Sequence, residues 1–231
     1  MKTILIKLSG ESLAGKYGHG FDFPYMKTIC SRIKKIHDMG INVAIVCGGG
    51  NFMRGRDANE MNRERADYIG MMATIMNALA LKDVFMSLGC EVYNQSGLEI
   101  SIMDNVDSSK ISEAFSRGEI VIFGGGTGKP YFSTDTGAAL RAKDAKADMI
   151  IKLTNVDGVY DKDPHKYDDA IMYNEITFDE VLKKELGVMD LSAMEICRDN
   201  NIEIIVTNID NEFALIDLIN GKKIGTRVYN K

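Results

Sequence analysis

The amino-acid sequence predicts an α/β fold, with a single three-layer α/β/α domain built on a mostly parallel central sheet. Short apolar runs alternate along the chain with segments whose apolar residues recur at helical spacing. The runs are continuously apolar, which is typical of parallel strands buried on both faces. No linker, repeat or low-complexity stretch interrupts the 231 residues, so we expect one domain over residues 1–231.

Each expected element follows from a local pattern. Strands are expected where apolar runs are bounded by glycine or polar residues, in chain order residues 3–8, 42–47, 91–93, 119–123, 148–153 and 203–206. Helices are expected where apolar residues recur at helical spacing, in chain order residues 25–39, 63–88, 108–117, 135–146, 178–186, 192–200 and 212–220. Gly40 and Gly118 end two of these helices. This order is that of repeated β-α-β units.

The composition excludes several classes of protein. Apolar residues make up 45% and charged residues 26%, which is ordinary for a folded, soluble chain and not for a disordered one. The net charge of −5 argues against a nucleic-acid polymer or an anionic membrane as the main partner. The first apolar run is broken by Lys7, too early for a signal peptide, and nothing is long and apolar enough to span a membrane, so we expect a cytoplasmic protein.

The cysteines and histidines do not indicate a metal centre. No C-x-x-C pair occurs, and no His/Cys cluster has the spacing of zinc ligands. Cys30, Cys47, Cys90 and Cys197 are therefore expected to be buried free thiols in a reducing compartment.

Three expected strands end in glycine-rich loops: Ser9-Gly10, Gly48-Gly49-Gly50-Asn51 and the loop at residues 124–128. Ligands of open α/β sheets bind at the carboxyl ends of the strands, and consecutive glycine amides can hold an anion there. Residues 10–16 have the spacing of a P-loop, but Tyr17 stands where serine or threonine must ligate magnesium. The dinucleotide pattern G-x-G-x-x-G fits neither of the other two loops.

Lys7 and Lys152 each lie near the carboxyl end of an apolar strand, in ILIKLSG and MIIKLTN. A lysine in a strand buried on both faces is unfavourable unless it is paired or binds an anion. Each lysine alone could simply reach water past the end of its strand. Two lysines at equivalent strand ends, beside glycine loops, favour a site for a polyanion.

Other polar residues near these loops have two interpretations each. Arg54 could bind a phosphate through its planar guanidinium or be a solvated loop residue. Asp135 could position the lysines or a metal, or could simply cap the helix that starts there. Asp67 would ordinarily belong to the solvated face of its helix.

The chain resembles the amino-acid-kinase family, and within it the bacterial-type uridylate kinases, over nearly its whole length. The segments that carry the resemblance are KLSGE (7–11), GGGNFMRG (48–55), MNRERAD (61–67), GMMATIMNALAL (70–81), GGGTGKPYFSTD (124–135), KLTNVDGVYDKDP (152–164) and ELGVMDLSA (185–193). The MNR-x-x-x-D helix and the loop TGKPYFSTD are the segments particular to uridylate kinases.

The resemblance implies a kinase that transfers the γ-phosphoryl group of Mg-ATP to UMP in pyrimidine nucleotide biosynthesis. The catalytic residues would be Lys7, which would act on the transferred phosphoryl group, Asp135 and Lys152. ATP would contact Lys7, Leu8, Ser9, Gly10, Gly50, Arg54, Thr154, Asn155, Tyr160 and Asp163. UMP would contact Gly49, Asp67 (through its ribose hydroxyls), Thr127, Gly128, Lys129, Pro130, Tyr131, Phe132, Ser133 and Thr134. Mg²⁺ would be carried by ATP, without an assigned protein ligand.

The resemblance also implies regulation and assembly. The activator GTP would act at a loop formed by Gly15, Lys16, Tyr17, Gly18, His19 and Gly20, and UTP would inhibit. The sequence departs from the family pattern at Lys16, Tyr17 and Lys129, which bears on the GTP response more than on UMP binding. The helix at 63–88 is apolar nearly all round, so it is buried within the domain or between subunits. In the family this region builds a hexamer from dimers.

The predicted chemistry needs few side chains. The acceptor phosphate is mostly a dianion at pH 7 and requires no general base. Two lysines, magnesium and glycine amides would suffice, because phosphoryl transfer depends mainly on positioning and charge neutralisation. Two alternatives stay open at this point. One is a member of the family with a different acceptor, such as a carbamate, a carboxylate or an isoprenoid phosphate; the other is a nucleotide-binding storage or regulatory protein without turnover.

Overall fold

The computed structural model describes residues 2–53 and 60–231, which form one nine-stranded sheet in the order β4-β3-β5-β2-β1-β6-β8-β9-β7. All pairings are parallel except that of β8 with β9. The strands are β1 (Thr3–Leu8), β2 (Asn42–Cys47), β3 (Val92–Ser96), β4 (Asp104–Asn105), β5 (Ile120–Gly124), β6 (Met149–Thr154), β7 (Glu175–Thr177), β8 (Glu203–Asn208) and β9 (Thr226–Tyr229). The predicted mostly parallel sheet is confirmed.

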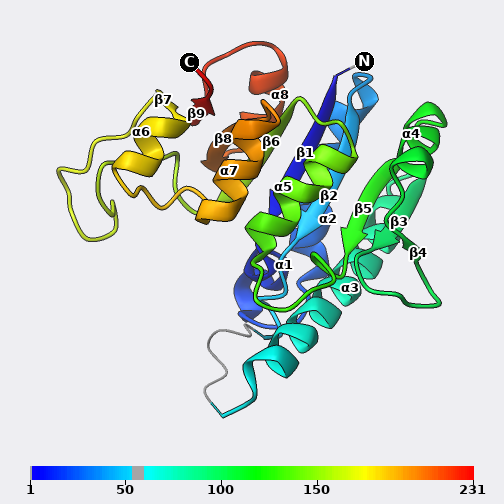
Figure 1. The fold of residues 1–231 in the computed structure, drawn as a ribbon. Helices are drawn as coiled ribbons and strands as arrows, with labels where there is room; N and C mark the ends of the chain where they lie inside the picture. Colours follow the sequence, from blue (N-terminus) through cyan, green and yellow to red (C-terminus); the bar gives the residue numbers. More distant parts are fainter. Residues whose placement is uncertain (1, 54–59) are drawn as a thin grey trace.

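Helices cover both faces of the sheet, as predicted (Figure 1). One face packs against α1 (Gly10–Ala14), α2 (Phe23–Asp38), α3 (Arg63–Ser87) and α8 (Ala214–Ile219). The other packs against α4 (Ser108–Ser116), α5 (Thr134–Asp144), α6 (Phe178–Lys183) and α7 (Leu191–Asp199). Alternate residues of the central strands enter the two apolar layers; in β1, Ile4 and Ile6 face the first and Leu5 the second.

The central strands are aligned so that their polar ends meet. β1 lies between β2 and β6, and β2 lies next to β5. Because these strands are parallel, the glycine loops that follow β1, β2 and β5 all leave the same edge of the sheet. Lys7 and Lys152 are direct partners in the register of β1 with β6.

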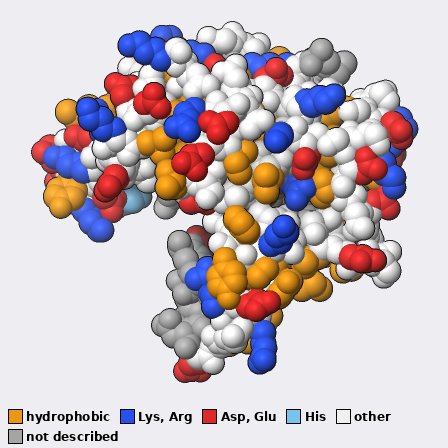
Figure 2. Space-filling view, in the orientation of Figure 1, with side chains coloured by type: hydrophobic (Ala, Val, Ile, Leu, Met, Phe, Trp, Pro, Cys, Tyr) orange, Lys and Arg blue, Asp and Glu red, His pale blue; other side chains and the backbone are white. Residues whose placement is uncertain are grey.

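Helix α3 is the longest helix and lies partly outside the core. Its buried side packs against α2, β3 and β5 through residues such as Ala78, Leu81 and Phe85. Its lower end extends beyond the sheet, and apolar side chains gather over this part of the surface (Figures 1 and 2). By length and hydropathy alone α3 could cross a membrane, but half of its most apolar window is buried inside the molecule, as in a core helix.

Several short or polar elements were not expected from the sequence. Strand β3 runs to Ser96, beyond the predicted 91–93, because its polar residues are buried and hydrogen-bonded: Asn94 Nδ2 donates to Ala78 O and Gln95 Oε1 accepts from the Asp107 amide. Helix α1 starts directly at Gly10 and is followed by a 3-10 turn (Gly15–Tyr17). Strands β4, β7 and β9 are only two to four residues long, too short for a periodic pattern.

All four cysteines are buried and unpaired, as predicted. Burial raises the pKa of both Cys47 and Cys197 to about 12, so neither thiol is a nucleophile at neutral pH.

The segment between β6 and β7 is fastened to the sheet by Thr226 of β9. Thr226 is fully buried, and its Oγ1 accepts from the amide of Val159 at 2.7 Å and donates to the carbonyl of Tyr173. A Cβ on Gly158 would lie 2.4 Å from this oxygen, so Gly158 must lack a side chain. One hydroxyl therefore joins both ends of the 155–174 segment to the sheet.

We predict that Thr226→Val lowers the free energy of unfolding by about 1–3 kcal/mol, because it leaves a buried amide and a partly buried carbonyl unsatisfied. Urea denaturation followed by circular dichroism measures this change. Thr28→Val is the matched control, since its hydroxyl bonds to Pro24 O on the exposed side of α2. Equal stability of the Thr226→Val variant and the unmodified protein would show that the Thr226 hydroxyl does not hold the 155–174 segment to the sheet.

Candidate active site

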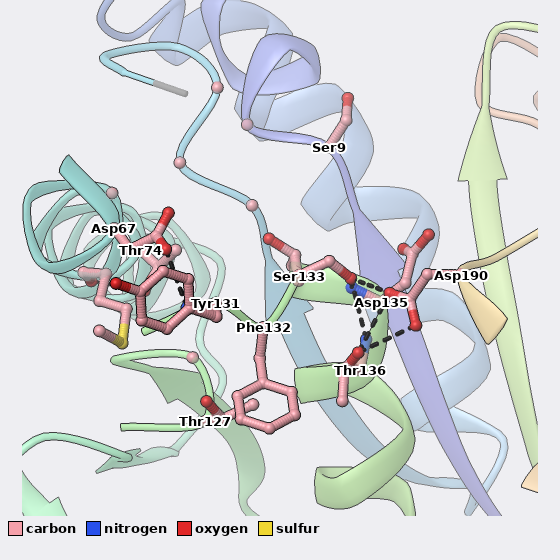
Figure 3. A pocket seen from close by; sticks show the side chains of 18 of the residues that line it. Ser9, Asp67, Thr74, Thr127, Tyr131, Phe132, Ser133, Asp135, Thr136 and Asp190 are labelled. Carbon is pink, nitrogen blue, oxygen red and sulfur yellow. Dashed lines mark hydrogen bonds between the residues drawn. The ribbon is translucent and has the colours of Figure 1, made fainter. Parts of the chain in front are cut away.

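A cavity of about 690 Å³ opens at the carboxyl edge of the sheet, where the glycine loops meet α3 and the starts of α5 and α7 (Figure 3). Its lining includes many of the predicted residues: Lys7, Ser9, Gly10, Gly49, Gly50, Asp67, Thr127, Lys129, Tyr131, Phe132, Ser133, Thr134 and Asp135. Segments distant in the sequence thus converge on one cleft.

Lys7, Asp135 and Lys152 form a largely buried ion-pair triad. Lys7 Nζ lies 2.7 Å from Asp135 Oδ1, and Lys152 Nζ lies 3.1 Å from Asp135 Oδ2. The three side chains are only 12%, 16% and 17% exposed for Lys7, Asp135 and Lys152 respectively. Lys152 Nζ also donates to Val188 O at 2.5 Å. One carboxylate therefore holds two ammonium groups; Lys7 and Asp135 line the cavity, and Lys152 lies behind Asp135.

The charges of the triad depend on one another. Burial alone would raise the pKa of Asp135, but the nearby ammonium groups of Lys7 and Lys152 outweigh burial and hold that pKa below its usual value. Burial lowers the pKa of Lys152, and Asp135 only partly offsets this effect. Asp135 is therefore ionised at neutral pH, and the site combines one anionic and two cationic positions.

Asp135 does not cap its helix, so that alternative interpretation is wrong. The N-cap of α5 is Ser133, whose Oγ accepts from the amides of Asp135 and Thr136. The Asp135 carboxylate is consequently directed to the lysines.

Asp190, to which the sequence analysis gave no role, supports this helix start. Ser133 Oγ donates to Asp190, and Thr136 Oγ1 donates to the same carboxylate at 3.0 Å (Figure 3). Asp190 also caps α7 by accepting from the amide of Ala193 at 2.9 Å. The signal in the sequence was an aspartate directly before a helical pattern, within the quoted segment ELGVMDLSA.

The first two glycine loops are packed backbone against backbone. A Cβ on Gly10 would lie 2.4 Å from Gly50 N and 2.5 Å from Gly48 O, which only glycine permits. In the third loop, the amide of Gly125 donates to Thr74 Oγ1 of α3 at 2.8 Å. The loops are therefore fixed to each other and to α3, as an anion cradle requires.

Asp67 faces the cavity and is not on a solvated helix surface. Its side chain is 11% exposed and accepts from Arg63 Nε at 2.9 Å. Asp67 Oδ2 also accepts from the amide of Tyr131 at 2.8 Å (Figure 3). Tyr131 has a φ of 70°, so this contact holds the loop between β5 and α5 in a left-handed turn at the cavity rim.

The remaining predicted site residues lie beside or outside this lining. Lys152 does not line the cavity but contacts Asp135, which does. Leu8, Gly128 and Pro130 are next to lining residues in the sequence. Thr154 ends β6, and Asn155, Tyr160 and Asp163 follow it in the segment that Thr226 holds. Arg54 lies outside the described residues.

The loop expected to bind an activator lies between α1 and α2, outside the cavity. It comprises Gly15, Lys16, Tyr17, Gly18, His19 and Gly20. It is attached to the second glycine loop, because the amide of Gly20 donates to Asn51 O and Gly20 O accepts from Asn51 Nδ2.

We predict that Asp135→Asn lowers the free energy of unfolding at pH 7 by about 3–5 kcal/mol, because two buried ammonium groups lose their counter-charge. The pKa of Asp135 is lower in the folded than in the unfolded chain, where it is about 3.9. The stabilisation is therefore present above that value and is lost as pH falls through the folded pKa.

Urea unfolding of both proteins from pH 7 down to pH 2 tests this, and the two stabilities should converge as the pH falls. The control is Asp38→Asn, which removes an exposed ion pair with Lys34 and should change stability by at most about 0.5 kcal/mol. A difference between the Asp135→Asn variant and the unmodified protein that is independent of pH would contradict the predicted titration.

Comparison with known proteins shows the family to which the chain belongs. The family model of the amino acid kinase family matches residues 2–208. The UMP kinase from Bacillus anthracis is 34% identical, with a TM-score of 0.96 over 100% of this chain and 96% of that one. The UMP kinase from Ureaplasma parvum is 38% identical, with a TM-score of 0.93 and 99% of each chain covered. The uridylate kinase from Archaeoglobus fulgidus is 27% identical, with a TM-score of 0.75 over 99% of this chain and 100% of that one. The chain therefore belongs to the amino acid kinase family.

Proposed function

We propose that this protein is a uridylate kinase, which transfers the γ-phosphoryl group of ATP to UMP and yields UDP and ADP. The observation that carries the proposal is the triad of Lys7, Asp135 and Lys152 beside the glycine loops. The full-length similarity to two UMP kinases, at 34% and 38% identity, supports UMP as the acceptor. The proposal treats residues 1–231 as one catalytic domain.

In this mechanism the protein positions two phosphates and neutralises charge. Lys7 and Lys152 are held about equally close to Asp135 and present their ammonium groups to the transferred group and its neighbouring oxygens. The amides of Gly10, Gly49 and Gly50 add fixed dipoles that cost no reorganisation during transfer. The UMP phosphate is itself the nucleophile, so the step requires no protein base.

The cavity offers separate places for the two nucleotides. Asp67 and the loop at residues 127–134 lie on its α3 side, where we place UMP. ATP would extend from Lys7, Leu8, Ser9 and Gly10 towards Thr154, Asn155, Tyr160 and Asp163, on the β6 side. Arg54, which follows the second glycine loop in the sequence, belongs to the same proposal.

Asp135 and Asp190 are engaged by other groups of the protein, which fits a magnesium ion that arrives already bound to ATP. Within residues 2–53 and 60–231, no group of three or more His, Cys, Asp or Glu side chains could hold a metal. Asp135 already binds two lysines, and Asp190 accepts from Ser133, Thr136 and Ala193. The ion would neutralise the phosphate oxygens of ATP.

A coupled ADP-release assay tests the proposed function. Mg-ATP is offered with UMP, CMP, dUMP, dTMP, AMP, carbamate, N-acetylglutamate, aspartate or isopentenyl phosphate as acceptor. We expect turnover on UMP to exceed that on every other acceptor. Faster turnover on a carboxylate or carbamate would overturn the acceptor assignment, and ATP binding without any turnover would indicate a storage or regulatory protein.

We predict that Lys7→Ala lowers kcat by about 100-fold or more while the KM for ATP changes little, because Lys7 acts on the transferred group. Initial rates over an ATP concentration series measure both constants. Lys16→Ala is the control, since Lys16 lies outside the cavity near the Tyr17 ring. An unchanged kcat for Lys7→Ala would contradict the role of Lys7.

We also propose that the protein is a cytoplasmic homo-oligomer, a hexamer built from dimers through α3. The helix carries a row of exposed apolar side chains, namely Tyr68, Ile69, Met72 and Met76, which are 39–46% exposed. A second copy would cover this row. GTP would activate and UTP inhibit such an assembly.

We predict a solution mass that is six times the 25.6 kDa of the chain at micromolar concentration, and a smaller mass for Met72→Glu, which places a charge in the row. Light scattering coupled to size exclusion measures both. Lys82→Gln on the same helix, which also lowers the net charge by one, is a control for the charge change. A monomeric mass for the unmodified protein would refute the oligomer.

A further inference from the structure

Two buried asparagines, one in the second glycine loop and one in α3, are hydrogen-bonded to each other. Asn77 in the middle of α3 is 0% exposed, and Asn51 at the end of the loop is 2% exposed. The neighbours of Asn77 along the helix, Ile75 and Ala78, belong to the apolar core. An amide in such surroundings is unfavourable unless all of its hydrogen-bonding groups are satisfied.

The two side chains satisfy each other and hold the backbone of two loops. Asn77 Nδ2 donates to Gly48 O at 2.6 Å and to Asn51 Oδ1 at 2.8 Å. Asn51 Nδ2 donates back to Asn77 Oδ1 at 2.9 Å and to Gly20 O at 2.9 Å. Each amide group therefore uses both of its donor hydrogens and its carbonyl oxygen.

The carbonyl that Asn77 holds belongs to the phosphate cradle. A Cβ on Gly10 would lie 2.5 Å from Gly48 O and 2.7 Å from Asn51 Oδ1, so the backbone of Gly10 packs directly against both groups. A displacement of Gly48 would therefore move Gly10 and Gly50, which line the cavity together with Lys7. Electrostatic stabilisation by such amides is lost when their geometry loosens by even about an ångström.

We propose that Asn77, paired with Asn51, is a positioning residue for phosphoryl transfer. It touches no substrate; it fixes the Gly48 carbonyl and thereby the amides of Gly10, Gly49 and Gly50. The inference deepens the proposed function and rests on it for its kinetic test. Its structural test does not depend on the identity of the substrate.

The test substitutes Asn77→Asp, which keeps the shape of the side chain and removes both donor hydrogens. The matched control is Asn94→Asp, because Asn94 is also buried and donates to Ala78 O of the same helix, away from the glycine loops. We expect Asn77→Asp to lower kcat about 10- to 100-fold with each KM within about threefold, measured at a temperature where the variant is fully folded. The control should keep kcat within about twofold.

Hydrogen–deuterium exchange supplies a readout that requires no activity. Amides of residues 48–53 should exchange at least about tenfold faster in Asn77→Asp, and those of β1 should not change. If Asn77→Asp fails to fold, Asn77→Ser, which leaves room for a water, should show a smaller kcat loss and the same exchange pattern.

Unchanged kcat and exchange in a folded variant, or an equal kcat loss in Asn94→Asp, would overturn the assignment. A failure of the unmodified protein to phosphorylate UMP would refute the proposed function instead, and the exchange experiment would then decide whether Asn77 positions the loop.

Discussion

The site depends on one interaction, the buried carboxylate of Asp135 between the ammonium groups of Lys7 and Lys152. Two ammonium groups with so little exposure repel each other and lose hydration, so they stay adjacent only because an anion lies between them. Three features of the fold place that anion: the register that makes Lys7 and Lys152 partners, the cap that frees the Asp135 side chain, and the contacts of Asp190 that join α5 to α7. The position of the Asp135 carboxylate between the two lysines thus depends on the sheet register and on the capping of α5 and α7.

Helix α3 supplies the second support of the site. Through Asp67 it holds the loop before α5, through Thr74 the third glycine loop, and through Asn77 the second. Asp67 and Thr74 line the cavity and Asn77 is fully buried, whereas the apolar row of α3 is exposed. A rigid helix that contacts several loops can keep backbone amides in place, and this suits a reaction whose catalysis consists of positioning and charge neutralisation.

Much of this could be predicted from the sequence, and the rest could not for physical reasons. The continuous strands, the glycine loops at their ends and the two strand-end lysines are local patterns, and each is confirmed. The role of Asp135 stayed open between a helix cap and a partner of the lysines, because Ser133 and Asp135 both suit an N-terminus and only three-dimensional contacts decide between them. The polar end of β3 and the asparagine within α3 were missed because their partners, such as Asp107 and Gly48, are distant in the sequence. Buried polar residues of this kind carry no periodic signal.

If the proposed function holds, the γ-phosphoryl group passes directly from ATP to UMP at a site organised by Asp135. Rapid-quench single turnover with Mg·[γ-³²P]ATP and UMP tests it most directly, on the unmodified protein and on Asp135→Asn at a temperature where both are folded. We expect that label passes only to UDP, that no labelled protein forms, and that the variant transfers about 100-fold or more slowly with nucleotide affinities changed far less. Labelled protein on the path to UDP, or transfer by the variant at the rate of the unmodified protein, would contradict it.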